Sequence, residues 1–167
     1  KHAGLNLCQF YRINHDLFVA GGILFNHESP RRKPNFVSRK IIQKAVSISQ
    51  GSSEKLILGD LNAVVDWGFA GDFVDAMYSI LQTERAEDFI VATGEKHSVR
   101  DFVREAFRQL DLDWEKHIEI DSSILQKTGF GNLVGDASKL RYKTGWAPKV
   151  SFNELIGIMI KSELGYD

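Results

Sequence analysis

Hydrophobic residues form one long run near the start of the chain. Residues 17–25 are mainly apolar and are bounded by polar residues, a pattern typical of a buried strand. Polar and charged residues follow at once, and we do not expect the strand to continue through them. Side chains that leave the end of a buried strand lie where open α/β sheets bind ligands. The segment 22–32 is therefore the first candidate for a functional loop.

Elsewhere, apolar residues recur at helical spacing. The first residues of the chain, with Leu5, Cys8 and Ile13 on one side, predict an amphipathic helix that leads into the first strand. Asn35 is expected to cap a second helix. Further helices are expected over 70–81, 98–110 and 151–160, and short strands over 55–59, 88–94 and 118–120. This alternation of helices and strands predicts an α/β fold.

Polar residues mark several helix ends. The Ser-x-x-acid pairs at 98–101 and 151–154 resemble capping boxes. A short helix is expected to begin at Asp136 and to end at Gly145. These signals divide the second half of the chain into short, well-bounded elements.

The first helix and strand together are only half of a βαβ unit. No Gly-x-Gly-x-x-Gly or Walker-type loop occurs in the sequence, although it contains 14 glycines. We therefore expect this chain to be the C-terminal part of a larger α/β protein.

Composition narrows the function classes. With 43% hydrophobic and 26% charged residues, the chain is typical of a globular protein rather than of a disordered segment. A formal net charge of -1 does not favour a nucleic acid or an anionic membrane as partner. Cys8 is the only cysteine and the five histidines are scattered, so neither a disulfide framework nor a metal site is expected. No segment approaches the roughly 20 apolar residues of a membrane span, and no secretory signal is present, so a cytoplasmic location is expected.

Several polar residues could carry chemistry, but each also has an ordinary structural explanation. Arg31 and Arg32 offer planar donor groups suited to phosphate, although a solvated surface pair is equally compatible with the sequence. Lys40, one turn into its helix, could reach an anion, but a solvated lysine is the commoner case. Asp66 could orient neighbouring backbone. Trp67 could stack on a ligand ring, and a place in the core is favoured for it.

The residues of 22–32, together with those of 35–40, 66–68 and 92–100, strongly resemble the GDP-mannose 4,6-dehydratases of the extended short-chain dehydrogenase/reductase superfamily. The resemblance covers nearly the whole chain. It implies the C-terminal part of a Rossmann-type doubly wound parallel sheet, plus the smaller α/β substrate-binding region. Residues 1–167 would then form a single C-terminal portion, with the N-terminal dinucleotide-binding segment absent.

The resemblance also assigns site residues. Lys1 would be the lysine of the family's Tyr-x-x-x-Lys motif, which holds the nicotinamide ribose and lowers the pKa of the tyrosine. NADP contacts are implied at Lys1, His27 and Arg32, and nucleotide-sugar contacts at Asn26, Val37 and Lys40. The tyrosine and its partner threonine and glutamate are not in this sequence, so we expect the chain by itself to be inactive.

Some positions depart from the family pattern. Val64 and Val65 replace a usual Lys-Arg pair, and Gln126 and Gly129 stand in a stretch where relatives carry Arg-Pro-Thr-Glu. Lys127 could replace one of the lost charges. The substrate is therefore expected to be GDP-mannose or a related GDP-sugar, such as a GDP-manno-heptose.

The function implied by this resemblance is an NADP-dependent lyase. Hydride leaves C4 of the sugar, water is lost across C5 and C6, and hydride returns to C6, which gives a 4-keto-6-deoxy sugar. The intact protein is expected to be a homo-oligomer that binds neither nucleic acid nor membrane. The alternatives are a nucleotide-sugar 4-epimerase or 4-keto reductase on the same fold, or a catalytically silent relative that only binds a nucleotide-sugar or a protein partner.

Overall fold

The computed structural model describes residues 1–124 and 133–166, and the chain forms an α/β fold. The helices are α1 (His2–Asn14), α2 (Val37–Ser49), α3 (Ala70–Leu81), α4 (Val99–Arg108), α5 (Trp114–His117), α6 (Ser138–Thr144) and α7 (Phe152–Glu163), with one 3-10 turn at Ser122–Ile124. The strands are β1 (Gly21–Leu24), β2 (Asn26–Glu28), β3 (Leu56–Leu58), β4 (Val64–Val65), β5 (Trp67–Phe69), β6 (Asp88–Val91), β7 (His97–Ser98) and β8 (Ile118–Ile120).

The strands pair mainly in parallel. β1 pairs with β6, β2 with β5 and β3 with β8, each in parallel, whereas β4 and β7 are antiparallel. Parallel pairing requires crossover connections, and helices provide several of them. The α/β class expected from the sequence is confirmed.

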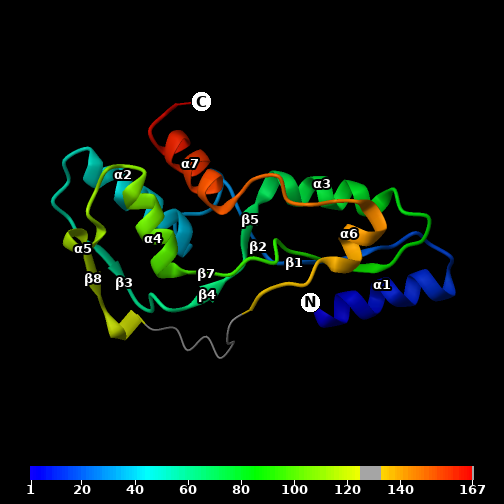
Figure 1. The fold of residues 1–167 in the computed structure, drawn as a ribbon. Helices are drawn as coiled ribbons and strands as arrows, with labels where there is room; N and C mark the ends of the chain where they lie inside the picture. Colours follow the sequence, from blue (N-terminus) through cyan, green and yellow to red (C-terminus); the bar gives the residue numbers. More distant parts are fainter. Residues whose placement is uncertain (125–132, 167) are drawn as a thin grey trace.

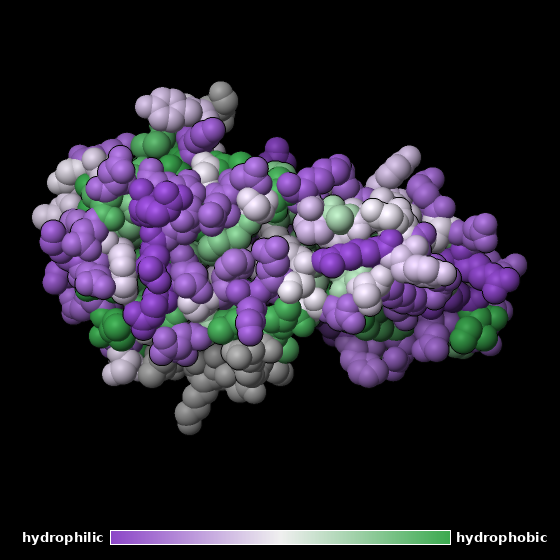
Figure 2. Space-filling model, in the orientation of Figure 1, coloured by the Kyte–Doolittle hydropathy of each residue, from purple (hydrophilic) through white to green (hydrophobic). Residues whose placement is uncertain are grey.

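The molecule has two lobes (Figures 1 and 2). Each lobe has its own hydrophobic core. The larger core is formed mainly by α2, α4 and α7 with β3, and it includes Trp67 of β5. The smaller core joins α3, α6 and β6 and includes Trp146. The short strands β2, β4, β5 and β7 lie where the lobes meet (Figure 1).

The first strand differs from the sequence prediction. β1 begins only at Gly21, and the polar residues after Phe25 do form a strand. The reason is a change of partner: the Phe25 amide donates to the Val91 carbonyl (2.9 Å), the last contact with β6, and the chain then pairs with β5 as β2. The expectation that the strand would stop at Asn26 is wrong.

Helix boundaries were predicted with mixed success. Both capping boxes, at Ser98 and Ser151, are present. Gly145 ends α6 with a left-handed φ of 70°, as expected. Asn35 does not cap α2, because the N-cap position is Phe36 and no side chain caps it. Asp136 accepts a hydrogen bond from the Ser138 amide (2.9 Å), but it does so from one residue before the cap position of α6.

The predicted first helix is present, but it has no buried residue. Its Leu7, Phe10 and Ile13 side chains are 56%, 50% and 69% exposed, and Ile23 of β1 is 40% exposed. Soluble proteins rarely expose so many large apolar side chains on neighbouring elements. Both α1 and β1 of the smaller lobe therefore carry large apolar side chains that are available for packing.

Asp66, between β4 and β5, joins three segments of the chain. Its fully buried carboxylate accepts hydrogen bonds from the Thr93 amide (3.0 Å) and hydroxyl (2.7 Å), the Gly94 amide (3.0 Å) and the Gly135 amide (3.2 Å). The expectation that Asp66 orients neighbouring backbone is confirmed. Trp67 is 3% exposed and packs against Phe102, so its expected place in the core is also confirmed.

Gly135 is expected to tolerate no side chain. A Cβ atom there would overlap the Cβ of Ala92 and approach the Phe25 ring to 2.9 Å. Gly135→Ala should therefore lower the free energy of unfolding by about 1–3 kcal/mol. Gly4→Ala is the control, because a Cβ on that residue of α1 meets nothing within 4 Å and should be neutral or stabilising by up to about 1 kcal/mol. Denaturant unfolding of both variants tests this, and equal stabilities would contradict it.

Candidate functional site

The candidate site lies at the end of β2 and in the loop that leads to α2. β2 and β5 run in parallel and end with Glu28 opposite Phe69. The loop then turns through Ser29, whose carbonyl accepts a hydrogen bond from the Arg32 amide (2.9 Å). The carboxyl ends of parallel strands are the usual place for ligand sites in α/β folds.

Glu28 is the buried polar centre of this loop. Its side chain is 2% exposed, and its Oε2 atom accepts a hydrogen bond from the Ser38 hydroxyl (2.7 Å). Ser38 is fully buried in the first turn of α2. Since a buried carboxylate is costly unless it has partners, this bond fixes the start of α2 against the end of β2.

Arg32 contacts the same carboxylate oxygen. Its Nε atom lies 3.2 Å from Oε2 of Glu28, but the N–H does not point at that oxygen, so the contact is an ion pair rather than a hydrogen bond. The guanidinium also lies over the Phe36 ring, 3.5 Å from its centroid. Among the described residues, none accepts a hydrogen bond from its two Nη groups, so the outer edge of the guanidinium can bind a ligand.

The surroundings of Glu28 act on its pKa in opposite directions. Burial raises the pKa above its ordinary value of 4.5, whereas Ser38, Arg32 and His27 lower it. The effect of burial is the larger one, so the pKa is raised.

Asn26 and His27 precede Glu28 on β2. The Asn26 side chain is exposed, and His27 is half-buried. The His27 ring packs against Phe73 of α3 (5.3 Å between centroids), and its Nδ1 atom lies 2.8 Å from the Phe25 carbonyl oxygen. Donation from Nδ1 to that carbonyl leaves Nε2 as an acceptor, and no described residue bonds to it.

Val37 and Lys40 lie three residues apart on the exposed side of α2. The Lys40 ammonium donates to the Ile57 carbonyl (2.6 Å) and so reaches toward β3 rather than β2. The structure thus brings Arg32 and α2 together through Glu28, whereas the Lys40 side chain is turned away from that loop and toward β3.

Lys1 precedes α1 and is exposed at its N-cap position. α1 runs antiparallel to β1, so its N-terminal end lies toward the middle of the molecule, on the side where β1 gives way to β2 (Figure 1). Its C-terminal end is fixed at the opposite side by the ion pair between Arg12 and Asp88 (2.5 Å).

Val65 is half-buried in β4, where it pairs with His97 of β7 and packs against the larger core. The other two positions that depart from the family pattern, Gln126 and Gly129, lie outside the described residues. Val65 is therefore placed as a packing residue in a strand.

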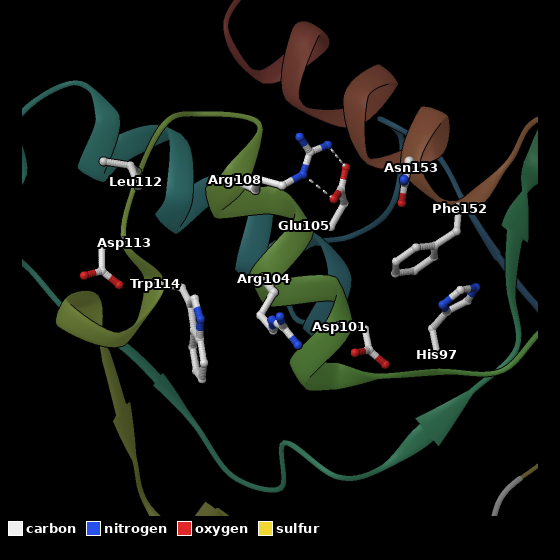
Figure 3. Close-up of a pocket in the computed structure, with 10 residues that line it drawn as sticks. All are labelled: His97, Asp101, Arg104, Glu105, Arg108, Leu112, Asp113, Trp114, Phe152 and Asn153. Atoms are coloured by element: carbon white, nitrogen blue, oxygen red, sulfur yellow. Dashed lines mark hydrogen bonds and ion pairs between the residues drawn. The ribbon is translucent and has the colours of Figure 1, made fainter.

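A separate hollow of about 560 Å³ lies on the outer face of α4 (Figure 3). Most of its charged groups already have partners: Glu105 with Arg108 (2.7 Å), Asp113 with Lys116 (3.2 Å), and Asp101 in the capping box. At one side the His97 ring is stacked on Phe152, 3.7 Å between centroids. None of the residues expected to bind a ligand lines this hollow, so the β2 loop remains the candidate site.

Two further findings concern only residues 1–124 and 133–166. No group of three or more His, Cys, Asp or Glu side chains there could hold a metal ion. No helix there has the length and apolar character needed to cross a membrane.

The family model for GDP-mannose 4,6 dehydratase matches residues 1–159. The chain belongs to this family. It is 47% identical over 154 residues to GDP-mannose 4,6 dehydratase 1 of Arabidopsis thaliana, covering 92% of this chain and 43% of the relative. It is 40% identical over 173 residues to GDP-mannose 4,6 dehydratase of Dictyostelium discoideum, covering 93% of this chain and 49% of that relative. The chain thus spans less than half the length of these relatives.

Solved structures confirm the fold. RMD from Pseudomonas aeruginosa, complexed with NADPH, superposes with a TM-score of 0.91 at 20% identity, over 100% of this chain and 55% of that chain. The dTDP-glucose 4,6-dehydratase of Bacillus anthracis, in complex with NAD, gives a TM-score of 0.81 at 20% identity, over 95% and 48%. The expected partial Rossmann-type fold is confirmed.

Sequence reasoning missed the two residues that organise the site of this dehydratase-family chain, Glu28 and Ser38. From the sequence, Glu28 is only one of the polar residues of segment 22–32, and Ser38 lies in the expected second helix without an assigned role. A signal for Glu28 was present, since a carboxylate four residues before Arg32 at the end of a buried strand can pair with it. Ser38 carries no such signal, because its partner lies in another element.

The raised pKa of Glu28 predicts a pH-dependent effect on stability. The folded protein holds this proton more tightly than the unfolded chain, so the contribution of Glu28 is most favourable below 4.5 and is lost as pH rises through the folded pKa. Glu28→Gln removes the ionisation but keeps an acceptor for Ser38. Relative to the parent, the variant should gain stability between pH 4 and pH 7, a trend measured by thermal melting. A variant that loses stability over this interval would show that the Arg32 contact outweighs burial.

Proposed function

We propose that this chain is the substrate-binding, C-terminal part of a nucleotide-sugar 4,6-dehydratase that acts on GDP-mannose or a related GDP-sugar. The observation that carries the proposal is the family match over residues 1–159. The polar loop after β2, with an arginine whose outer edge is available, supports it. Relatives that align with 92% of this chain at 47% identity bear the name GDP-mannose 4,6 dehydratase.

In this proposal, residues 1–167 form one C-terminal portion of an extended short-chain dehydrogenase/reductase. The exposed apolar residues of α1, such as Leu7 and Phe10, and the exposed Ile23 of β1 would pack against the dinucleotide-binding portion. A parallel strand such as β1 is normally covered on both sides, which agrees with this arrangement. The intact protein is proposed to act as a homo-oligomer.

The residues of the β2 loop fit a nicotinamide cofactor, and we propose that the cofactor is NADP. Arg32 can donate from its Nη groups to a phosphate, and Lys1 can donate from its exposed ammonium. Nε2 of His27, as an acceptor, can take a hydrogen bond from a hydroxyl or amide group of the cofactor. The cofactor, when bound, supplies a reversible acceptor for hydride, which no side chain of this chain can provide.

The proposed roles of the chain's own residues are binding and electrostatic. Lys1 would hold the nicotinamide ribose, and its charge would lower the pKa of the family's tyrosine. Asn26, with an exposed amide, and Val37 and Lys40, on the exposed side of α2, would contact the nucleotide-sugar. The Lys40 ammonium would exchange the Ile57 carbonyl for a charged oxygen of that ligand, which is the stronger acceptor.

Product analysis tests the proposed reaction. Full-length protein incubated with GDP-mannose and NADP should give a 4-keto-6-deoxy product that is lighter by one water. A 4-epimerase would give an isomer of unchanged mass, and a silent relative would leave the sugar unchanged. A 4-keto reductase would also leave GDP-mannose unchanged, but it would oxidise NADPH in a second assay that supplies a 4-keto nucleotide-sugar. The 167-residue chain alone should form no product and should not bind NADP with sub-micromolar affinity. Any of these three outcomes, or activity of the chain alone, would contradict the proposal.

Val65→Arg tests whether this position belongs to the substrate site. Because Val65 packs against the larger core, an arginine there should lower the free energy of unfolding by about 1–3 kcal/mol without tightening GDP-mannose binding. Val64→Arg is the matched control, since the neighbouring side chain faces the other side of β4 and should be tolerated better. Thermal melting and GDP-mannose titration of both variants measure this. Tighter binding by Val65→Arg with unchanged stability would instead place the residue in the substrate site.

A further inference from the structure

We propose that Glu28 is a positioning residue for cofactor binding, whose buried carboxylate holds the Arg32 guanidinium against Phe36 with its outer edge toward the ligand. The inference rests on the proposed function, which assigns Arg32 to the NADP site. It goes beyond that function because it gives a role to a residue that contacts neither cofactor nor substrate.

The first support is the direction that Glu28 imposes on Arg32. The Nε edge of the guanidinium is buried beside Oε2 of Glu28, 3.2 Å away, while the two Nη groups make no hydrogen bond to a described residue. An arginine binds phosphate best through two parallel N–H groups on one edge. The ion pair therefore occupies the inner edge and leaves the outer edge available.

A second support is that three contacts limit the movement of Arg32. The Phe36 ring covers one face of the guanidinium at 3.5 Å from the ring centroid, and the Arg32 amide is tied to the Ser29 carbonyl (2.9 Å). Oε2 of Glu28 is itself fixed by the buried Ser38 hydroxyl at 2.7 Å. A guanidinium held in this way loses little conformational entropy when a phosphate binds.

The third support is that the carboxylate is unfavourable for the fold. Burial raises the pKa of Glu28, which means that the folded chain disfavours the charged form. A neutral side chain of the same shape would serve packing at least as well. The charge lowers the stability of the fold at this position, and its orientation of the Arg32 guanidinium explains why a carboxylate is present.

The test compares Glu28→Gln with Glu54→Gln in the full-length protein. Glutamine keeps the shape and an acceptor for Ser38 but loses the charge that orients Arg32, so the Kd for NADP should rise about tenfold, which corresponds to about 1.4 kcal/mol. Glu54 lies beyond the C-terminal end of α2, is exposed and pairs with Lys44, and its variant should bind NADP as the parent does. The melting temperature of Glu28→Gln at pH 7 should not fall. A lower melting temperature together with weaker NADP binding would mean that Glu28 is only structural.

A double-mutant cycle with Arg32→Ala decides whether Glu28 acts through Arg32. Arg32→Ala should weaken NADP binding, and adding Glu28→Gln should then weaken it no further. If Arg32→Ala alone leaves the affinity unchanged, the assignment of Arg32 in the proposed function is wrong. If Arg32→Ala weakens binding but the two effects add, Arg32 binds the cofactor and the positioning role of Glu28 is refuted.

Phe36→Leu tests the position of the Arg32 guanidinium independently, and it can be used even if Glu28→Gln does not fold. Phe36 is 40% exposed, so its replacement should leave the cores intact while it removes the surface under the guanidinium. NADP binding should weaken about threefold, a loss typical of an exposed cation–π contact. The effect should disappear in the Arg32→Ala background. An unchanged affinity for NADP would contradict the proposed arrangement.

Discussion

The buried carboxylate of Asp66 is the interaction on which the arrangement of this chain depends. It lies between β4 and β5 and accepts four hydrogen bonds, from Thr93, Gly94 and Gly135. A carboxylate without water around it is stable only when donors surround it, so these segments can meet only in this geometry. Asp66 thereby fixes β5 against the end of β6. Because β5 carries Trp67 into the larger core and pairs with β2, the same interaction places the loop after β2.

Asp66 and Glu28 show two ways of burying a carboxylate. Asp66 has donors for both of its oxygens, three of them backbone amides, and such a group serves the fold. Glu28 has one hydrogen bond, from Ser38, and one imperfect ion pair, with Arg32. Its charged form is disfavoured by burial. A buried charge whose partners are incomplete needs an explanation beyond packing. The proposed positioning of Arg32 supplies one.

The sequence predicted what depends on neighbouring residues and missed what depends on tertiary contacts. The capping boxes at Ser98 and Ser151 and the glycine at 145 are local signals, and the structure has them all. The residues around Phe25 do not indicate the change of strand partner, because β2 is stabilised by β5, which lies about forty residues further along the chain. The hydrogen bond from Ser38 to Glu28 could not be predicted from the sequence either, because the two residues lie in different elements. Motif resemblance located the candidate loop, but not the residue that organises it.

The pairing of Arg32 with Glu28 also determines what kind of contact Arg32 can make. The two charges lie 3.2 Å apart, so an approaching phosphate meets a pair that is close to neutral. In the proposed cofactor site, Arg32 would then contribute directed hydrogen bonds rather than net positive charge, which requires the planar fork of an arginine. The attraction at longer range has to come from other cations. Arg31 and Lys1 are exposed and have no ion pair with a described residue, which suits them to that role. In the proposed site, the loop would thus separate attraction of the phosphate from its orientation, and the buried Glu28 would make that separation possible.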